Sequence, residues 1–430
     1  MRFPIALLLL ALGHAIPADA SIVKRATDRF HSVALKHSAG LARDIRTVLN
    51  GFIVESPKGQ VRIGVNQKPY CVSKSSTSGG SNASSGNGTS NANSPSSGSS
   101  SARPSSTSTS SGASPSAKLS SNWKVAKSYS GNNFFSGWDF FTGGDPTNGI
   151  ITYVDQNTAQ SNNLTSINSA GNAIMGVDTT AQVSGNNRKS VRITTEYAFT
   201  GGLVIMDSVH MPTGCGTWPA FWTNGPNWPA GGEIDIVEGV NDYTNNQATI
   251  HTNHGCTLSS SNATALGFSG TIVGGTNCAA LETGNAGCGV RAVQTNSFGA
   301  AFNNIGGGVY TMLWDNNGVS VWFFPRSSIP SDITAGAPQP ANWGVPMARW
   351  ASSSCNSSTF FSDHSAIFDT TLCGDWASGV WSSTGVPGQD QSCAQRTGVS
   401  TCEAFVQNNG AAFQQAYWEV KSVNIYQNSS

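Results

Sequence analysis

Residues 231–238 of this 430-residue chain, Gly-Gly-Glu-Ile-Asp-Ile-Val-Glu, limit the fold more than any other segment. Their Ile and Val side chains favour extended backbone, and the glycines before them are typical of a strand boundary. The segment is therefore predicted to form a β-strand. Charged residues make up only 11% of the chain, yet three carboxylates lie in this one strand, which makes it the first candidate for a chemical site.

The spacing of the three carboxylates predicts an irregular strand. Side chains of a regular strand alternate between its faces, so Glu233 and Asp235 share a face while Glu238 points the other way. A single β-bulge near Ile236 or Val237 would return Glu238 to the same side. Mutual repulsion and partial burial would then separate the proton affinities of the three groups, as a pair of acid and base carboxylates requires.

Short runs rich in β-forming residues recur through residues 119–430, separated by Gly, Asn, Pro and Ser. Helical periodicity is scarce in this region, and the sequence contains no internal repeat. The pattern predicts one large all-β domain, an antiparallel sandwich with long loops. The clearest runs are 149–154, 190–194, 203–206, 319–324 and 418–426.

The N-terminus has the features of a secretion signal. Arg2 precedes a short apolar run, and Ala18-Asp19-Ala20 offers a small-residue cleavage site, so residues 1–20 are interpreted as a signal peptide. The apolar run is too short to cross a bilayer, and no later stretch is continuously apolar. We expect a secreted, extracellular protein without a membrane segment, either free or associated with a cell wall.

Composition divides the rest of the chain into three parts. Residues 21–73 carry nine Lys or Arg against three acids, whereas residues 119–430 carry ten against nineteen. Between them, residues 74–118 are dominated by Ser, Gly, Asn, Thr and Pro, which predicts a flexible, O-glycosylated linker because almost no side chain can be buried. The basic segment is interpreted either as a pro-region with a Lys24-Arg25 processing site or as a solvated arm.

The nine cysteines suit an oxidising compartment. Cys71 stands apart, and the other eight follow residue 200, an even number that predicts disulfides without giving their connectivity. No CxxC pair indicates zinc. Sequons for N-glycosylation begin at Asn82, Asn87, Asn163, Asn262, Asn356 and Asn428.

Aromatic residues crowd the acidic segment in the sequence. Trp218, Trp222 and Trp228 precede it, and His251 follows in the next expected strand. Indole faces can stack on the apolar faces of sugar rings, so these side chains are candidates for contact with a carbohydrate. The alternative is core packing, which applies above all to Trp222 beside Phe221.

These residues together resemble glycoside hydrolase family 16, and within it the fungal laminarinase branch of endo-β-1,3(4)-glucanases. The resemblance covers about residues 119–430. The motifs that carry it are Gly214–Trp222, Gly232–Asp242, His251-Thr252, Phe323–Arg326, Cys373–Ala377 and Ala416–Trp418.

The resemblance implies a β-jelly-roll of two stacked antiparallel sheets with a concave substrate cleft, and cleavage with retention of configuration. Carried onto this chain, Glu233 would be the nucleophile, Glu238 the general acid/base and Asp235 the assisting acid between them. Retention requires carboxyl groups only about 5–5.5 Å apart. The two Glu backbones are about 13 Å apart on a strand, so both long side chains must lean inward.

The bulge also bears on the substrate that the resemblance implies. In the family, the spacing Glu-x-Asp-x-Glu belongs to bacterial lichenases and xyloglucan transferases, whereas this chain has one extra residue. The laminarinase side is therefore favoured, with β-1,3-glucans and mixed-linkage 1,3-1,4-glucans as expected substrates. Arg192 and Trp376 are further candidates for sugar contact. The alternative for Arg192 is a surface ion pair, and the alternative for Trp376 is packing.

Two other functions stay open. The same glycosyl-enzyme could pass its sugar to an acceptor chain, as in a cell-wall transglycosylase, and a third interpretation is a glucan-binding protein without turnover. Three adjacent acids argue against binding alone. No cofactor and no metal are expected, because Cys256 near His251 and His254 fits a disulfide better than a ligand set. The acid excess of the β domain argues against nucleic-acid binding, and we expect a monomer.

Overall fold

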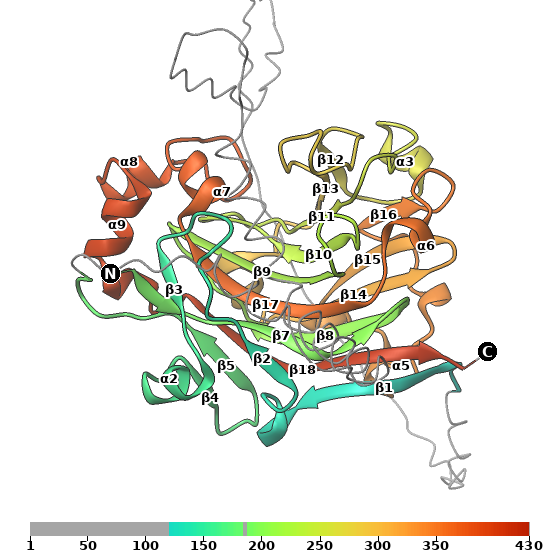
Figure 1. Cartoon of the computed structure of the whole chain (residues 1–430), viewed down its shortest axis with the longest axis horizontal. Coiled ribbons are helices and arrows are strands. Elements are labelled where there is room, and N and C mark those ends of the chain that lie inside the picture. Colours follow the sequence, from blue (N-terminus) through green and yellow to red (C-terminus); the bar gives the residue numbers. More distant parts are fainter. Residues whose placement is uncertain (1–119, 184–186, 430) are drawn as a thin grey trace, which may run out of the picture. The chain divides into compact units, whose positions relative to one another are not determined.

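The computed structural model describes residues 120–183 and 187–429. These residues form two eight-stranded antiparallel sheets that lie as two layers (Figure 1). The predicted all-β sandwich is confirmed, and a two-stranded parallel sheet of β3 (Ile151–Tyr153) and β6 (Arg188–Ser190) is an exception to antiparallel pairing. The predicted signal peptide, basic segment and linker lie outside the described residues.

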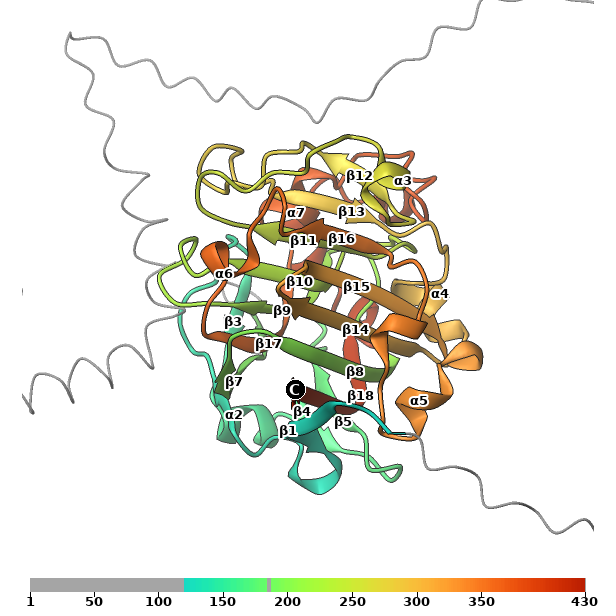
Figure 2. The same cartoon turned by 90° about the vertical axis from the view of Figure 1, so that its right-hand side faces the viewer.

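We call the sheet that contains the acidic segment the front sheet. The acidic segment forms β10, and Figure 2 shows the neighbouring strands on both sides of it. Across the sheet the order is β12 (Thr271–Gly274), β13 (Cys288–Arg291), β11 (Gln247–His251), β10 (Glu233–Glu238), β9 (Thr217–Asn224), β17 (His364–Leu372), β7 (Arg192–Phe199) and β2 (Trp138–Phe140).

We call the other large sheet the back sheet. Its longest strand, β18, pairs with β8 and also with β1, which lies off the main path of the sheet. The order is β16 (Ala348–Ala351), β15 (Gly318–Pro325), β14 (Gly308–Asp315), β8 (Gly202–His210), β18 (Tyr417–Asn428), β5 (Ala173–Gly176) and β4 (Thr165–Ile167), with β1 (Trp123–Ser130) beside β18.

Helices occur only as short pieces between the strands of the described residues, and none of them is long and apolar enough to cross a membrane. The α-helices are α2 (Gln156–Ser161), α3 (Ala263–Leu266), α4 (Gly299–Asn304), α5 (Ser331–Thr334), α6 (Ser357–Phe360), α7 (Gly374–Gly379), α8 (Cys393–Thr397) and α9 (Cys402–Asn408). The 3₁₀ turns are η2 (Gly131–Asn133), η3 (Arg326–Ser328), η4 (Pro340–Asn342) and η5 (Gly410–Phe413).

The main hydrophobic core lies between the two sheets. Ile234 and Phe221 of the front sheet belong to the same buried cluster as Met206, Met312 and Val423 of the back sheet. Because side chains alternate along each strand, the residues between these core positions face away from the back sheet. On β10 and β9 that outer face carries the candidate site.

Disulfides join the long loops to the sandwich. All eight cysteines after residue 200 are paired, which confirms the predicted disulfides. The sequence left their connectivity open, and the spatial approach of distant loops decides it. The pairs are Cys215–Cys393, Cys256–Cys355, Cys278–Cys288 and Cys373–Cys402.

Candidate active site

A β-bulge interrupts β10 where the spacing of its acids predicts one. Asp235 and Val237 are two positions apart, but their partners on β9, Trp222 and Phe221, are adjacent in the sequence. Ile236 is therefore the extra residue. The bulge turns the last carboxylate of β10 to the outer face, where all three carboxylates line one pocket.

The side chain of Asn246 holds the bulge. Its Oδ1 accepts a hydrogen bond from the backbone N–H of Glu238 at 3.0 Å, and its Nδ2 donates to the carbonyl of Ile236 at 2.9 Å. Asn246 is fully buried, and its own backbone N–H donates to Ser297 Oγ at 2.9 Å. A bulge breaks the regular ladder, so one side chain here replaces two sheet hydrogen bonds. Sequence reasoning missed this residue, which lies directly before β11 and eight residues after Glu238.

The pocket floor is a row of residues that face one another across four strands. Glu238 of β10 is opposite Ala220 of β9, Ala220 is opposite Asp369 of β17, and Asp369 is opposite Arg192 of β7. All four line the same pocket. Directly paired residues share a face of the sheet, so strand register brings together residues from widely separated parts of the sequence.

Glu238 lies in surroundings that favour its protonated form. Burial raises the pKa of its carboxyl group well above the ordinary value, and the negative charge of Asp235 raises the pKa further. The indole Nε1–H of Trp218 donates to Glu238 Oε1 at 2.8 Å and opposes part of this shift. A carboxyl group kept protonated beside a second carboxylate can act as a general acid.

Glu233, Asp235 and His251 form the other side of the site. Glu233 is 4% exposed and Asp235 3% exposed, and His251 Nε2 lies 3.3 Å from Asp235 Oδ2 and 4.0 Å from Glu233 Oε1. The register explains the approach, because Glu233 is directly opposite His251 in the pairing of β10 with β11. His251 itself is buried, 6% exposed.

Arg192 is enclosed among aromatic rings. Its side chain is 2% exposed, and its guanidinium lies 4.6 Å from the ring centre of Phe141 and 5.1 Å from that of Trp222. The interpretation of Arg192 as a surface ion pair is therefore wrong. Its Nε is buried without a hydrogen-bond partner among the described residues, and the residue lines the pocket that holds the three acids.

The four predicted tryptophans divide into two pairs. Trp218 and Trp222 line the pocket, and Trp222 also contacts Ala220 and Ile367 on the outer face of the front sheet. Trp228 lies in the loop before β10, half-buried, and is not among the pocket residues. Trp376 of α7 packs edge to face on Trp218, with ring centres 5.7 Å apart, and is also outside the pocket lining.

Several pocket residues were not predicted from the sequence. Asp145 accepts hydrogen bonds from Thr147 and Thr371, and Asp369 joins them in the pocket from β17. An acid and a hydroxyl at alternate positions of one strand, Asp369 and Thr371, were the available signal. Asp145 lies in a loop, where side chains do not alternate regularly, so the sequence does not indicate which of them reach the site.

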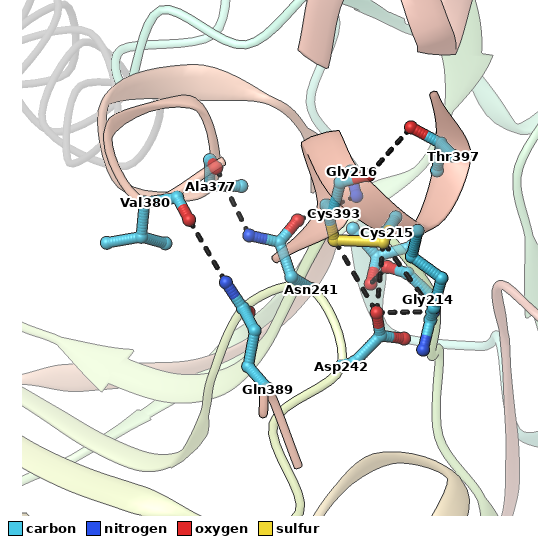
Figure 3. Close-up of polar contacts among 12 residues, drawn as sticks. Gly214, Cys215, Gly216, Asn241, Asp242, Ala377, Val380, Gln389, Cys393 and Thr397 are labelled. Carbon is cyan, nitrogen blue, oxygen red and sulfur yellow. Dashed lines mark hydrogen bonds and ion pairs between the residues drawn. A yellow bond between two sulfur atoms is a disulfide. The ribbon is translucent and has the colours of Figure 1, made fainter. Parts of the chain in front are cut away.

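The loops beyond the front sheet are tied to the site by Asn241 and the Cys215–Cys393 disulfide (Figure 3). Asn241 follows β10, accepts a hydrogen bond from the backbone N–H of Gly216 at 2.7 Å, and donates to the carbonyl of Ala377 at 3.1 Å. Asn241 is fully buried. These contacts hold α7, and with it Trp376, against the ends of β9 and β10.

Two groups in the described residues have the donors for a metal ion. One is Cys215, Asp242 and Cys393, but its two sulfur atoms are bonded to each other. The other is Glu233, Asp235 and His251, whose donor atoms lie within 4.8 Å of one another. Cys256 is bonded to Cys355, as expected from the sequence in preference to a ligand set with His251 and His254, and His254 pairs with Glu282.

Comparisons with known proteins agree with this geometry. Residues 138–426 match the family model of the XgeA-like catalytic domain of glycoside hydrolase family 16. A probable glycosidase of Schizosaccharomyces pombe is 46% identical over 286 residues, which are 66% of this chain and 64% of the relative. An endo-1,3(4)-beta-glucanase of Emericella nidulans, xgeA, is 42% identical over 286 residues, 66% of this chain and 44% of the relative. The chain thus spans 44 to 64% of the length of these curated relatives.

Two solved structures are similar over almost their whole length. Laminarinase 16A of Phanerochaete chrysosporium, in complex with 6-O-glucosyl-laminaritriose, has a TM-score of 0.63 at 37% identity and covers 71% of this chain and 99% of its own. An elongating family 16 β-1,3-glucosyltransferase has a TM-score of 0.62 at 37% identity, covering 71% of this chain and 100% of its own. The similarity therefore extends over the complete described sandwich.

Proposed function

Because the chain belongs to the XgeA-like branch of glycoside hydrolase family 16, we propose that it is a secreted endo-acting hydrolase of β-1,3-glucans and mixed-linkage 1,3-1,4-glucans. The observation that carries the proposal is the bulged strand β10, which brings Glu233, Asp235 and Glu238 to one pocket. The substrate class rests on the names of the relatives and on the laminari-oligosaccharide bound by the similar laminarinase.

The proposed chemistry is a double displacement with retention of configuration. The carboxylate of Glu233 attacks the anomeric carbon while protonated Glu238 donates its proton to the leaving glycosidic oxygen, which breaks the bond and forms a glycosyl-enzyme. Glu238, now ionised, accepts a proton from water as the water attacks the same carbon and releases Glu233. The raised pKa of Glu238 supports the first step, since the acid must carry its proton when the substrate binds.

The other acidic and aromatic residues have positioning and binding roles in this proposal. His251 lies beside both Glu233 and Asp235, and together with Asp235 it would orient Glu233 toward the sugar. Trp222, Trp218 and Arg192 line the pocket and would contact the sugar rings and hydroxyls. Trp228 and Trp376 are not among the pocket residues, and in this proposal they would contact the glucan only beyond the pocket.

Transglycosylation is the second candidate, and one observation favours it. The similar glucosyltransferase has the same identity to this chain as the laminarinase, 37%, and nearly the same TM-score. Both reactions share the glycosyl-enzyme and differ only in whether water or a sugar hydroxyl attacks it. The pocket described here serves either outcome.

The test is product analysis of the purified protein with laminarin, lichenan, cellulose and xyloglucan. Shortened products from laminarin and lichenan, with the β-anomer appearing first by NMR, are the expected result. Lengthened products from laminari-oligosaccharides would identify the transferase. Activity on cellulose or xyloglucan alone would overturn the substrate class, and loss of activity in EDTA would contradict the expectation that no metal is needed.

A further inference from the structure

An unusual backbone step lies at the end of β17. Cys373, the residue that follows the strand, has a φ of 62° and a ψ of −116°. Left-handed φ values are uncommon for residues other than glycine, because the side chain crowds the backbone. Gly374 comes next with a φ of 72°, so two consecutive residues have left-handed φ values. Such strain persists only where the surroundings enforce it, and it is concentrated at functional sites.

The surroundings hold Cys373 through three long-range contacts. Its backbone N–H donates to the carbonyl of Gly216 at 2.8 Å, and its backbone forms an isolated β-bridge with Gly149. Its side chain is bonded to Cys402 of α9. All three partners lie in other parts of the fold, so tertiary contacts enforce the step rather than local preference.

The bare backbone of Gly374 packs against Trp218. A Cβ added at Gly374 would lie 3.2 Å from Cε3 and Cζ3 of the Trp218 indole and 2.7 Å from the carbonyl oxygen of Thr147. A side chain therefore fits at Gly374 only if a neighbour moves. Strand register explains the approach, because Trp218 is directly opposite Thr371, and the chain turns over the indole as soon as β17 ends.

The other side of the same indole contacts the proposed acid. Trp218 Nε1 donates to Glu238 Oε1 at 2.8 Å, and this bond lowers the pKa of Glu238 against the larger effect of burial. Cε3 and Cζ3 lie on the side of the indole away from Nε1, so the rigid ring transmits a displacement at Gly374 to this hydrogen bond. The bond is already near its optimal length, so a displaced N–H loses alignment and the bond weakens.

The charged groups that act on Glu238 lie on other elements than Gly374. Burial is the main cause of the raised pKa of Glu238, neighbouring acids raise the pKa further, and a neighbouring histidine lowers it. A substitution in α7 leaves all of these groups in place. They are Asp235 and Glu233 on β10 and His251 on β11.

We propose that Gly374 is a positioning residue, which holds the indole of Trp218 on the carboxyl group of Glu238. The inference rests on the proposed function, in which Glu238 is the acid. Glycine is required at this position for two reasons: its φ is left-handed, and the missing side chain leaves room for the indole. The enforced step at Cys373 brings Gly374 to that place.

The test compares Gly374→Ala with the matched control Gly398→Ala. Gly398, at the end of α8, has a φ of 68°, and a Cβ added there meets no neighbouring atom within 4 Å. Both variants place an alanine in left-handed backbone, but only Gly374→Ala presses on Trp218. The alkaline limb of the kcat/KM profile for laminarin should move up by about 0.5 pH in Gly374→Ala and stay in place in Gly398→Ala.

A double variant separates positioning from a general loss of structure. Once Trp218→Phe has removed the indole N–H, adding Gly374→Ala should not move the alkaline limb further, because the two changes act on one hydrogen bond. A further movement of the same size in the double variant would overturn the proposal. An unmoved limb in folded Gly374→Ala would overturn it as well.

Asn148→Gly provides the test if Gly374→Ala does not fold. Asn148 is exposed, and its φ of 61° suits glycine. Its Nδ2 lies 3.0 Å from both carboxylate oxygens of Asp375, the residue after Gly374. Loss of this contact frees the backbone at Gly374 to move from the indole without adding a clash, so the limb should again move up. An unmoved limb would then overturn the proposal.

The titration of Glu238 is also followed without substrate. Its carboxyl signal in NMR spectra is identified by its absence from Glu238→Gln, and it should show the same upward movement in Gly374→Ala. Failure of the wild type to cleave any β-glucan would overturn the proposed function, whereas this titration would still decide whether Gly374 positions the indole. The two failures are therefore distinguishable.

Discussion

The amide of Asn246 fixes the backbone of Glu238. Its Oδ1 accepts a hydrogen bond from the backbone N–H of Glu238 at 3.0 Å, and its Nδ2 donates one to the carbonyl of Ile236 at 2.9 Å. The amide therefore spans the bulge that turns Glu238 toward the pocket. Glu238 reaches the site only because the strand gains one residue at this point. The position of the proposed acid thus depends on a side chain that does not touch the pocket.

Asn246→Ala should lower kcat/KM for laminarin about a hundredfold, since misplacement of a catalytic group by about 1 Å has an effect of this size. The loss should be smaller for an aryl glucoside with an activated leaving group, because such a group leaves without help from an acid. Steady-state kinetics on both substrates measure the difference. An equal loss on both would contradict positioning of Glu238.

Asn245→Ala is the matched control for this substitution. Asn245 is also buried, and its Nδ2 donates to the carbonyl of Ala292 at 2.8 Å, but it makes no contact with the bulge. Both variants lose two side-chain hydrogen bonds, and each buried partner left unsatisfied costs about 1–3 kcal/mol. We expect similar decreases in thermal stability and a selective loss of activity only for Asn246→Ala.

Trp218→Phe should move the alkaline limb of the kcat/KM profile to higher pH. The indole N–H stabilises the ionised form of Glu238, so its loss raises the pKa of a carboxyl that burial and Asp235 already raise. The alkaline limb reports deprotonation of the acid in the free enzyme. Trp376→Phe, which alters the neighbouring ring without a bond to Glu238, is the control, and a downward shift for Trp218→Phe would contradict the assignment.

Glu238→Gln should abolish turnover and stabilise the fold at neutral pH. The pKa of Glu238 is raised on folding, so above the ordinary Glu value of about 4.3 the unfolded chain releases this proton more readily, and stability is lost as pH rises toward the folded pKa. A neutral Gln avoids that loss, with an expected gain of about 1 kcal/mol at pH 7. Urea unfolding at pH 7 and pH 4 checks it, because the gain should vanish at pH 4.

His364 should make the domain sensitive to acid. Its ring is fully buried between Thr223 and the carbonyl of Gly231, and burial lowers its pKa to about 3. Below about pH 6.5 the side chain of His364 is protonated in the unfolded chain but stays neutral in the folded chain. The free energy of unfolding therefore falls by about 1.4 kcal/mol per pH unit down to about pH 3. Denaturant titrations across this range measure the slope, and His364→Asn should reduce it, at some loss of stability at pH 7.

The order of residues along the chain was sufficient to predict those features that depend only on residues close together in the sequence. The β-branched residues Ile234, Ile236 and Val237 predict a strand, and the spacing of the acids in β10 predicts a bulge, because side chains alternate faces along extended backbone. The pairing of eight cysteines as disulfides followed from their even number and from the expected compartment. Arg192 was correctly placed on a strand, but its enclosure by Phe141 and Trp222 was not foreseen.

The sequence by itself therefore determined that β10 carries three carboxylates on one face and that the chain resembles family 16. Tertiary structure decided which distant residues join them: the row Glu238, Ala220, Asp369 and Arg192 exists only in the register of four strands. It also decided that the pKa of Glu238 is raised, since desolvation depends on what surrounds a group in space. Strand pairing and burial are properties of the packed sandwich, and no local period of the sequence encodes them.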